Sequence, residues 1–567
     1  MQADKKPAVT KGKTPGCSIR AVASRVRAVA EGADILIGID SGTSVVKAVA
    51  FDLAGNQIAA SAVPNRTDSG PDGSATQPLE RTWADCAQAV RGLGDKVERL
   101  ARRTAAVAVT AQGDGTWLVG AGDTPVGDAW LWLDARAAPS VARLNRGPLE
   151  GARFAATGTG LNTCQQGAQM AEMERSAPGL LDRAEVALHC KDWLYLKLTG
   201  VRATDPSEAA WTFGDFRSRS YDDTVIEALG LTRRRGLLPE IVDGTMVTHP
   251  LSAAAAEATG LRAGTPVSLG YVDMVMTALG AGVHTGDTDA ACTVIGSTGV
   301  HLLSKRDWEV VLNPDRTGYV MALPVPGYVT QMQTNMAAAL NIDWALRVAA
   351  ELMSDMGHPV VHHDLVRHIE PWLAASTPGA LLYHPYISEA GERGPFVDAN
   401  ARAGFIGLTS HHRFPDLVRA VAEGLGLAAR DCYAAMGPLP RELRLTGGAA
   451  RSRQLRAILG GAVQARVRVS EREEAGAAGA AMMAAVAIGA YPSMDTCIAQ
   501  WVTPLLGPAE APDPGLVATY EGLFPAYVTA RGALAPVWAA LAGRGGAEAS
   551  IDAGSPGAVP ASERSTA

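Results

Sequence analysis

The feature that most constrains the fold is a pattern that occurs twice in the chain. The first copy, ILIGIDSGTSVVKAVAF (35–51), has two apolar runs separated by a small polar turn. The second copy, AACTVIGSTGVHLLS (290–304), has the same order of apolar run, Gly-Ser-Thr turn and apolar run. Each copy predicts a β-hairpin that opens a domain. The chain is therefore predicted to contain two similar halves, with a boundary near residues 283–288.

Helices and strands are predicted to alternate within each half. In the first half a helix is expected over 82–102, followed by a strand in AAVAVTAQGDG (105–115). In the second half LRLTGGAARSRQLRAILGG (443–461) indicates a strand, a Gly-Gly turn and a helix. This alternation predicts an α/β fold. Two such halves would enclose a central cleft, which is a common place for ligands.

The two ends of the chain have compositions that differ from the body. Residues 1–33 are basic and lack the apolar core of a signal peptide, so we expect a disordered basic extension, with a transit peptide as the alternative. Residues 542–567 are rich in Gly, Ala, Ser and Pro, which predicts a disordered tail. The expected domains are then 34–285 and 286–541.

Composition and charge exclude several classes of partner. The net charge is −7, from 51 basic and 58 acidic residues, so no basic face for nucleic acid is expected. No apolar run approaches the ~18 residues of a membrane helix. The seven cysteines are scattered and form no Cys-x-x-Cys pair, which indicates free thiols in a reducing compartment, the cytoplasm. A homodimer is the one assembly that we consider.

One carboxylate stands alone in an apolar stretch. Asp273 lies within YVDMVMTALGAGV (271–283). A buried and unpaired carboxylate is costly and tends to take up a proton. Asp273 is therefore expected either to cap a helix or to line a cleft in which a carboxylate is needed, and the two roles are compatible.

Three glycine-containing turns are candidates for binding phosphate. Backbone N–H groups of such turns can form a concave anion site, and hydroxyl groups can add donors. The alternative for each is an ordinary tight turn between regular elements. No Walker A motif is present. The candidates are Gly42, Thr43, Ser44 and Lys47 in the first turn, Gly296, Ser297 and Thr298 in the second, and Gly447, Gly448 and Ser452 in the third. Asp40, at the end of the first strand, could hold Mg²⁺ directly or through water.

Polar and aromatic residues gather in QGDGTW (112–117) and WLWLDAR (130–136). Hydroxyl groups of a ligand need paired donors and acceptors, and indole rings can cover its C–H faces. The mixture favours a site for a polyhydroxylated ligand, with capped turns and core tryptophans as the alternative. The candidate residues are Gln112, Gly113, Asp114, Trp132 and Asp134.

These segments together resemble the FGGY family of carbohydrate kinases, within the sugar kinase and actin-like superfamily. The resemblance covers nearly all of residues 34–541. IGIDSGTSVVKAVAFD and IGSTG are similar to the two phosphate motifs, GYVDMVMTALGAGV to the segment of the catalytic aspartate, and LTGGAARSRQL to the adenosine motif. KDWLYLKLTG…ATDPSEA (191–209) and ISEAGERGPFVDANARAGFIGL (387–408) are also similar to family segments. The sequence departs from the family at Tyr271-Val272, where Gly-His or Gly-Gly is more usual.

The resemblance implies two ribonuclease-H-like domains around a cleft. ATP would lie mostly on the C-terminal half and a small polyol or sugar on the N-terminal half. Asp273 would take the proton from the attacking hydroxyl, and Asp40 and Asp273 would position Mg²⁺. Asp273 would then also contact the polyol.

The acceptor is expected from a narrower resemblance. TWADCAQAVRGL, QGDGTWL and WLWLDARA are most similar to the branch of the family that phosphorylates a terminal hydroxyl of erythritol. Gly113-Asp114 stands where glycerol-specific members carry Arg-Glu and xylulose-specific members carry Met-His. Xylulose and glycerol remain alternative acceptors. A remote alternative is an ATP-binding regulator without catalysis, although no helix-turn-helix segment is present.

Overall fold

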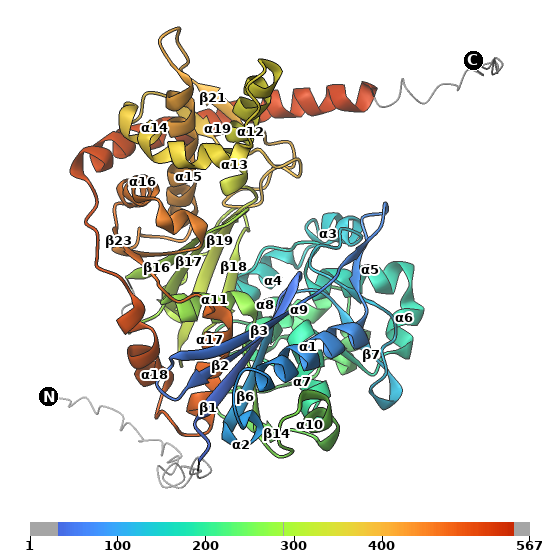
Figure 1. The fold of residues 1–567 in the computed structure, drawn as a ribbon. Helices are drawn as coiled ribbons and strands as arrows, with labels where there is room; N and C mark the ends of the chain where they lie inside the picture. The colour runs from blue at the N-terminus through green and yellow to red at the C-terminus, as the bar shows by residue number, and fades with distance from the viewer. Residues whose placement is uncertain (1–31, 287–288, 549–567) are drawn as a thin grey trace, which may run out of the picture.

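The computed structural model describes residues 32–286 and 289–548 of the chain (Figure 1). The basic extension predicted for residues 1–33 lies almost entirely outside these residues, as does the tail from residue 549. Helix α19 (Pro514–Glu548) continues for seven residues beyond Leu541, where the sequence predicts the end of the second domain. Extending an existing helix costs less than starting a new one, so composition alone did not mark its end.

The first half is built on a six-stranded mixed sheet. Strands β1, β2 and β3 form an antiparallel meander, and β6 and β15 lie parallel to β1 on its other side. In spatial order the strands are β14 (Thr248–Pro250), β15 (Pro266–Leu269), β6 (Thr104–Ala111), β1 (Ile35–Ser41), β2 (Val45–Asp52) and β3 (Gln57–Pro64).

The second half repeats five strands of this topology, and its sixth strand, β18, pairs with the meander strand β19, whereas β14 pairs with the parallel strand β15. Its meander is β16, β17 and β19, and β22 and β23 follow in parallel on the other side of β16. In spatial order the strands are β18 (Tyr319–Ala322), β19 (Tyr328–Asn335), β17 (Gly299–Arg306), β16 (Ala290–Ile295), β22 (Glu442–Thr446) and β23 (Arg466–Val469). The two predicted hairpins therefore occupy equivalent places, and the prediction of two similar α/β halves is confirmed.

Helices cover both faces of the first sheet, which explains why its strands are apolar at consecutive positions. Residues such as Ile35 and Ile37 face helices α1 (Leu79–Gly94) and α7 (Cys190–Thr199). Leu36 and Val49 face the opposite side, against helices α11 (Asp273–Ala281) and α17 (Ala475–Ala487). The single helix expected over 82–102 is divided into α1 and the short α2 (Leu100–Arg103), because Arg99 adopts a left-handed conformation with φ of 56°.

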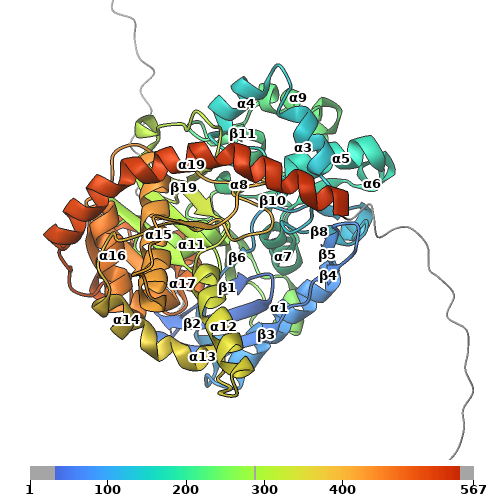
Figure 2. The same cartoon turned by 90° about the horizontal axis from the view of Figure 1, so that it is seen from above.

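The second sheet carries its own helices. Helix α19 packs on α15 and α16 and crosses the molecule in Figure 2. The main helices on this sheet are α12 (Ala339–Asp355), α14 (Ile369–Ala375), α15 (Phe414–Ala434) and α16 (Arg453–Val463). Helix α18 (Met494–Trp501) packs instead on α17, with Trp501 against Phe51 of β2.

Helix α17 belongs to the second half in sequence but packs on the sheet of the first half. Its small residues allow close approach of the backbones. A methyl group on Gly38 would lie 2.0 Å from the carbonyl oxygen of Ala477, and one on Gly479 would lie 2.3 Å from that of Met276. The small residues of α17 therefore serve close packing of this helix against β1 and α11. Contiguous sequence ranges therefore describe the two halves only approximately.

The cysteines within the described residues are all free and buried: Cys86, Cys164, Cys190, Cys292, Cys432 and Cys497. Cys17 lies outside the described residues. Among the helices of the described ranges, none combines the length and the apolar character that crossing a membrane requires.

Candidate active site

Three parallel strands of the first sheet end at the same edge, and each is followed by a predicted site segment. Residues 42–44 follow β1, residues 112–114 follow β6 and residues 271–273 follow β15. The β6 and β15 ends are tied together, because Gly270 N–H donates to the Val109 carbonyl (2.8 Å) and Thr110 Oγ1 donates to the Tyr271 carbonyl (2.6 Å). The carboxyl ends of parallel strands are the usual ligand edge of an α/β sheet.

Asp273 is the first residue of helix α11. Its Oδ1 accepts a hydrogen bond from Met274 N–H (2.7 Å), while Val272 occupies the N-cap position. Burial raises the pKa of Asp273 well above its usual value, and the nearby carboxylate of Asp40 raises it further. No cation within the described ranges forms an ion pair with Asp273. It is thus a half-buried carboxylate with an increased affinity for protons.

Asp40, near the end of β1, lies close to the carboxylate of Asp273 and against helix α17. A methyl group on Gly476 would lie 2.3 Å from Asp40 Oδ2, so the carboxylate fits only beside a glycine. Burial raises the pKa of Asp40 to about 6, although Lys47 opposes this shift. Lys47 itself is paired with Glu474, with Nζ 2.9 Å from Oε2.

The first turn is hydrogen-bonded to the predicted polyol residues. Thr43 Oγ1 donates to Gln112 Oε1 (2.8 Å) and accepts from Trp132 Nε1 (2.9 Å). Gln112 Nε2 donates to Gln77 Oε1 (2.8 Å), and Gln77 Nε2 returns to the Thr43 carbonyl (3.1 Å). The Trp132 side chain remains 43% exposed. This closed network joins Thr43, for which the sequence predicts phosphate binding, to residues predicted to bind the polyol.

Asp114 is buried in a left-handed conformation, with φ of 58°, and Gly115 follows with φ of 75°. Its Oδ2 accepts a long hydrogen bond from Tyr319 OH (3.5 Å), and its Oδ1 has no partner within the described residues. Burial raises the pKa of Asp114 to about 6. The side chains of Cys164 and Trp211 lie close enough to lower the pKa of Asp114, but Oδ1 has no well-formed hydrogen bond to either. A buried acceptor in this state is rare in folded proteins and is a candidate partner for a ligand hydroxyl.

Gly113, in the same turn as Asp114, packs closely against the turn that precedes Asp273. A methyl group on Gly113 would lie 2.5 Å from the side chain of Val272, which precedes Asp273. The two turns therefore touch, and a larger residue at position 113 would push them apart.

Asp134 has a different environment from the other predicted polyol residues. Its carboxylate is buried, pairs with Arg136 (2.6 Å) and accepts from Ala75 N–H (3.0 Å). Arg136 stacks over Trp130, 3.7 Å from the ring centroid. These contacts hold the loop, and the structure does not bring Asp134 into the network of Thr43 and Gln112.

The two turns of the second half also lie at adjacent strand ends. Residues 296–298 follow β16 and are exposed, and Gly447 follows the parallel β22 with φ of 89°. A methyl group on Gly447 would lie 2.9 Å from the Ile295 carbonyl oxygen. Gly448 has open space around its Cα. Ser452 begins helix α16 by accepting from Leu455 N–H (3.1 Å).

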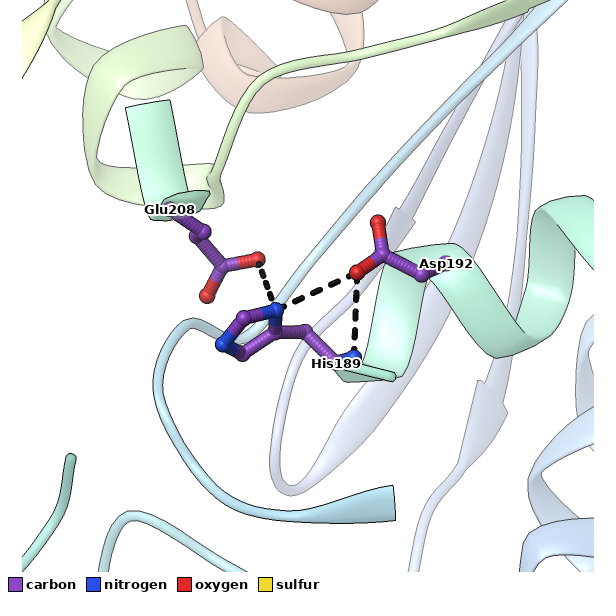
Figure 3. Close-up of side chains that lie close together, drawn as sticks. All are labelled: His189, Asp192 and Glu208. Carbon is purple, nitrogen blue, oxygen red and sulfur yellow. Dashed lines mark hydrogen bonds and ion pairs between the residues drawn. The ribbon is translucent and has the colours of Figure 1, made fainter. Parts of the chain in front are cut away.

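A buried charged cluster lies behind Asp114. His189, Asp192 and Glu208 have ligand-type atoms close enough to surround a metal ion (Figure 3). Lys191 Nζ, however, lies 2.6–2.7 Å from carboxylate oxygens of Asp192, Asp205 and Glu208. The lysine therefore supplies the positive charge that these carboxylates need, and a metal ion is not required there.

Comparisons with known proteins identify the family. Residues 35–280 match the N-terminal domain of the FGGY family of carbohydrate kinases, and residues 291–488 match its C-terminal domain. The chain belongs to this family. It is therefore a carbohydrate kinase that uses ATP as a substrate and a sugar or polyol as the acceptor.

The relatives include one of high identity. The chain is 68% identical over 515 residues, 91% of this chain and 99% of the relative, to the erythritol kinase of Brucella abortus (strain 2308). It is 28% identical to the xylulose kinase of Escherichia coli (strain K12), over 75% of this chain and 84% of that one. The solved structure of a ligand-bound xylulose kinase from Lactobacillus acidophilus has the same fold, with a TM-score of 0.80, 22% identity and coverage of 89% of this chain and 99% of that one.

Several residues at the site were not found from the sequence. Lys191 stands next to Asp192, and Glu208 follows Asp205 and Ser207, so neither is a lone charge in an apolar stretch and the reasoning used for Asp273 assigns them no role. Tyr319 and Cys164 carry no such signal. Their proximity, with Cys164 Sγ 3.3 Å from Tyr319 OH, depends on the packing of β18 against the first half.

Proposed function

We propose that the chain transfers the γ-phosphoryl group of ATP to a terminal hydroxyl of erythritol. The 68% identity to an erythritol kinase over almost its entire length is the observation that carries this acceptor. The polar groups near Asp114 agree with it, because the unpartnered Oδ1 can accept from a polyol hydroxyl. Gln112 and Trp132, joined through Thr43, would line the same site.

Asp273 is the proposed proton acceptor. Its carboxylate begins α11 beside the polyol turn, and its raised pKa makes it a stronger base than an exposed aspartate. The acceptor hydroxyl would donate its proton to Asp273 as the oxygen attacks the phosphorus. The contribution of the protein is mainly positioning and charge stabilisation.

Asp40 fits a role in holding Mg²⁺. It offers hard oxygen ligands, and its neighbour Lys47 is occupied by Glu474. Asp40, with Asp273, would hold the ion, which supplies positive charge to the phosphates when bound. The hydroxyl groups of Ser44, Ser297 and Thr298 would donate hydrogen bonds to the phosphates, and Gly447 and Gly448 would flank the adenosine.

The test is ADP release by purified protein with Mg·ATP and a panel of acceptors. The panel contains erythritol, D- and L-threitol, xylitol, glycerol, and D- and L-xylulose, with a control lacking acceptor. The highest kcat/KM is expected with erythritol. A higher value with a ketopentose or with glycerol would refute the proposed acceptor and leave the kinase assignment intact.

A further inference from the structure

The start of helix α8 (Pro206–Phe213) contacts two turns of the proposed site. Asp205 caps this helix, and its side chain accepts from Ser207 N–H (2.7 Å). Asp205, Ser207 and Glu208 are all fully buried. Helix α8 thus presents two polar side chains, those of Ser207 and Glu208, toward the edge where β6 and β15 end.

Glu208 holds the turn that carries Asp114. Its Oε1 accepts a hydrogen bond from Asp114 N–H (2.9 Å). Asp114 has a positive φ, a conformation that non-glycine residues adopt at some cost. The hydrogen bond from Glu208 helps to stabilise this conformation and so directs the Asp114 carboxylate.

Ser207 holds the turn that carries Asp273. Its Oγ accepts from Val272 N–H (3.2 Å), and its own hydroxyl donates to Asp205 Oδ1. Because the hydroxyl proton is committed to Asp205, the lone pairs of Oγ are directed to Val272. The residue immediately before the proposed base is therefore fixed to the same helix turn as Glu208.

Lys191 joins the two contacts into one unit. Its Nζ lies 2.6 Å from Glu208 Oε2 and 2.7 Å from Asp205 Oδ2, and all three side chains are inaccessible to solvent. A buried ion cluster adds little net stability, but it fixes the geometry of its members. Lys191 therefore opposes movement of Glu208, and through Asp205 the same lysine also holds Ser207 in place.

We propose that Lys191, Ser207 and Glu208 form a positioning unit that sets the distance between the polyol-binding Asp114 and the base Asp273. This inference rests on the proposed function. The unit touches neither substrate; it acts by holding the two turns that do. Its loss would leave ATP binding intact and would place the acceptor hydroxyl wrongly against Asp273.

The test compares Glu208→Ala and Glu208→Gln with the control variants Glu423→Ala and Glu423→Gln. Glu423 is also buried, is paired with an arginine (Arg419, 2.7 Å) and accepts from a backbone N–H (Gly379, 3.0 Å), but it lies in the second half. Thermal unfolding gives the stability of each variant, and kcat and KM are measured for both substrates. Sugar phosphate formed per ADP released is measured as the coupling ratio.

For Glu208→Ala we expect kcat/KM for the acceptor to fall by about 10²-fold, since a displacement of roughly 1 Å has this effect, with KM for ATP unchanged. The coupling ratio should fall below that of wild type. Glu208→Gln keeps an oxygen for Asp114 N–H and should recover part of the loss. The Glu423 variants should lose stability while keeping wild-type coupling and acceptor KM.

Ser207→Ala removes only one hydroxyl and is the alternative variant if Glu208→Ala does not fold. It should lower kcat more than it changes KM for the acceptor. Two results would overturn the proposal. One is an equal loss of acceptor kcat/KM and coupling in the Glu208 and Glu423 variants. The other is wild-type acceptor kinetics and coupling in the Glu208 and Ser207 variants. Wild-type protein is assayed first. Absence of turnover with erythritol would refute the acceptor alone, and the variants would then be compared on the acceptor that wild type uses.

Discussion

Gly476 offers a sharp test of how the packing of α17 controls the site. Substitution by alanine adds one methyl group beside the carboxylate of Asp40. That methyl carbon would lie 2.3 Å from Asp40 Oδ2 and 3.1 Å from Thr277 Oγ1. Asp40 is the residue proposed to hold Mg²⁺, so the added atom acts directly on a site group.

The size of the effect follows from these distances. Ordinary contact begins at 3.4 Å, so the carboxylate and the methyl group must separate by about 1 Å. A displacement of that size is expected to lower kcat/KM by about 10²-fold. Overpacking costs about 1–3 kcal/mol, of which the better helix propensity of alanine returns about 1 kcal/mol. The protein should therefore fold while losing most of its activity.

The assay is ADP release at saturating ATP and erythritol over a range of Mg²⁺ concentrations. We expect a lower kcat and a higher Mg²⁺ requirement for Gly476→Ala. Gly461→Ala is the control, because its methyl group would also be too close, 2.7 Å from Leu516 Cβ, but at the contact of α16 with α19. Wild-type kcat and Mg²⁺ dependence in Gly476→Ala, or equal losses in the control, would refute the reasoning.

Three further substitutions test individual side chains. Asp273→Asn should lower kcat by several orders of magnitude while calorimetry shows unchanged ATP binding; a variant with most of its activity would exclude Asp273 as the base. Asp114 has a folded-state pKa of about 6, above the ordinary 3.8, so its charge destabilises the fold above pH 6 and this cost disappears as the pH falls below 4. Asp114→Asn should thus stabilise the fold by up to about 3 kcal/mol at pH 8 and by little at pH 4, and it should abolish acceptor turnover. Unfolding measured at both pH values tests this pH dependence, and equal stability changes at the two pH values would contradict it. Trp132→Phe loses the donor to Thr43 and should raise KM for erythritol at unchanged melting temperature, whereas an unchanged KM would remove Trp132 from the site.

The fold could be predicted from the sequence because its signals are local. The repeated hairpins and the alternation of strands and helices each lie within a few tens of residues. The position of α17 could not be predicted in this way. Its glycines and alanines indicate close packing, but nothing near residue 475 specifies β1, more than four hundred residues earlier, as the partner.

The candidate site, like the fold, could be predicted only where the signal lies within a single segment of the sequence. The sequence predicts Asp273, Gln112 and Asp114 as site residues because polar residues at the ends of apolar strands stand out, and the structure places them after the neighbouring strands β15 and β6. Thr43 was placed with the phosphates because its turn is rich in glycine and hydroxyl groups, whereas its hydrogen bonds are to Gln112 and Trp132. These bonds depend on how three separate segments meet, and that information is absent from any one of them.

The placement of α17 also has a consequence for synthesis of the protein on the ribosome. When residue 290 has been made, the first sheet is complete, but the face that contains Leu36 and Val49 still lacks α17, one of the two helices packed against it. The segment 475–487 follows roughly 10–40 s later at 5–20 residues per second. During this interval the nascent first half exposes an apolar sheet face. Chains arrested before residue 475 should therefore bind chaperones or be degraded by proteases. The second half of the chain completes the core of the first.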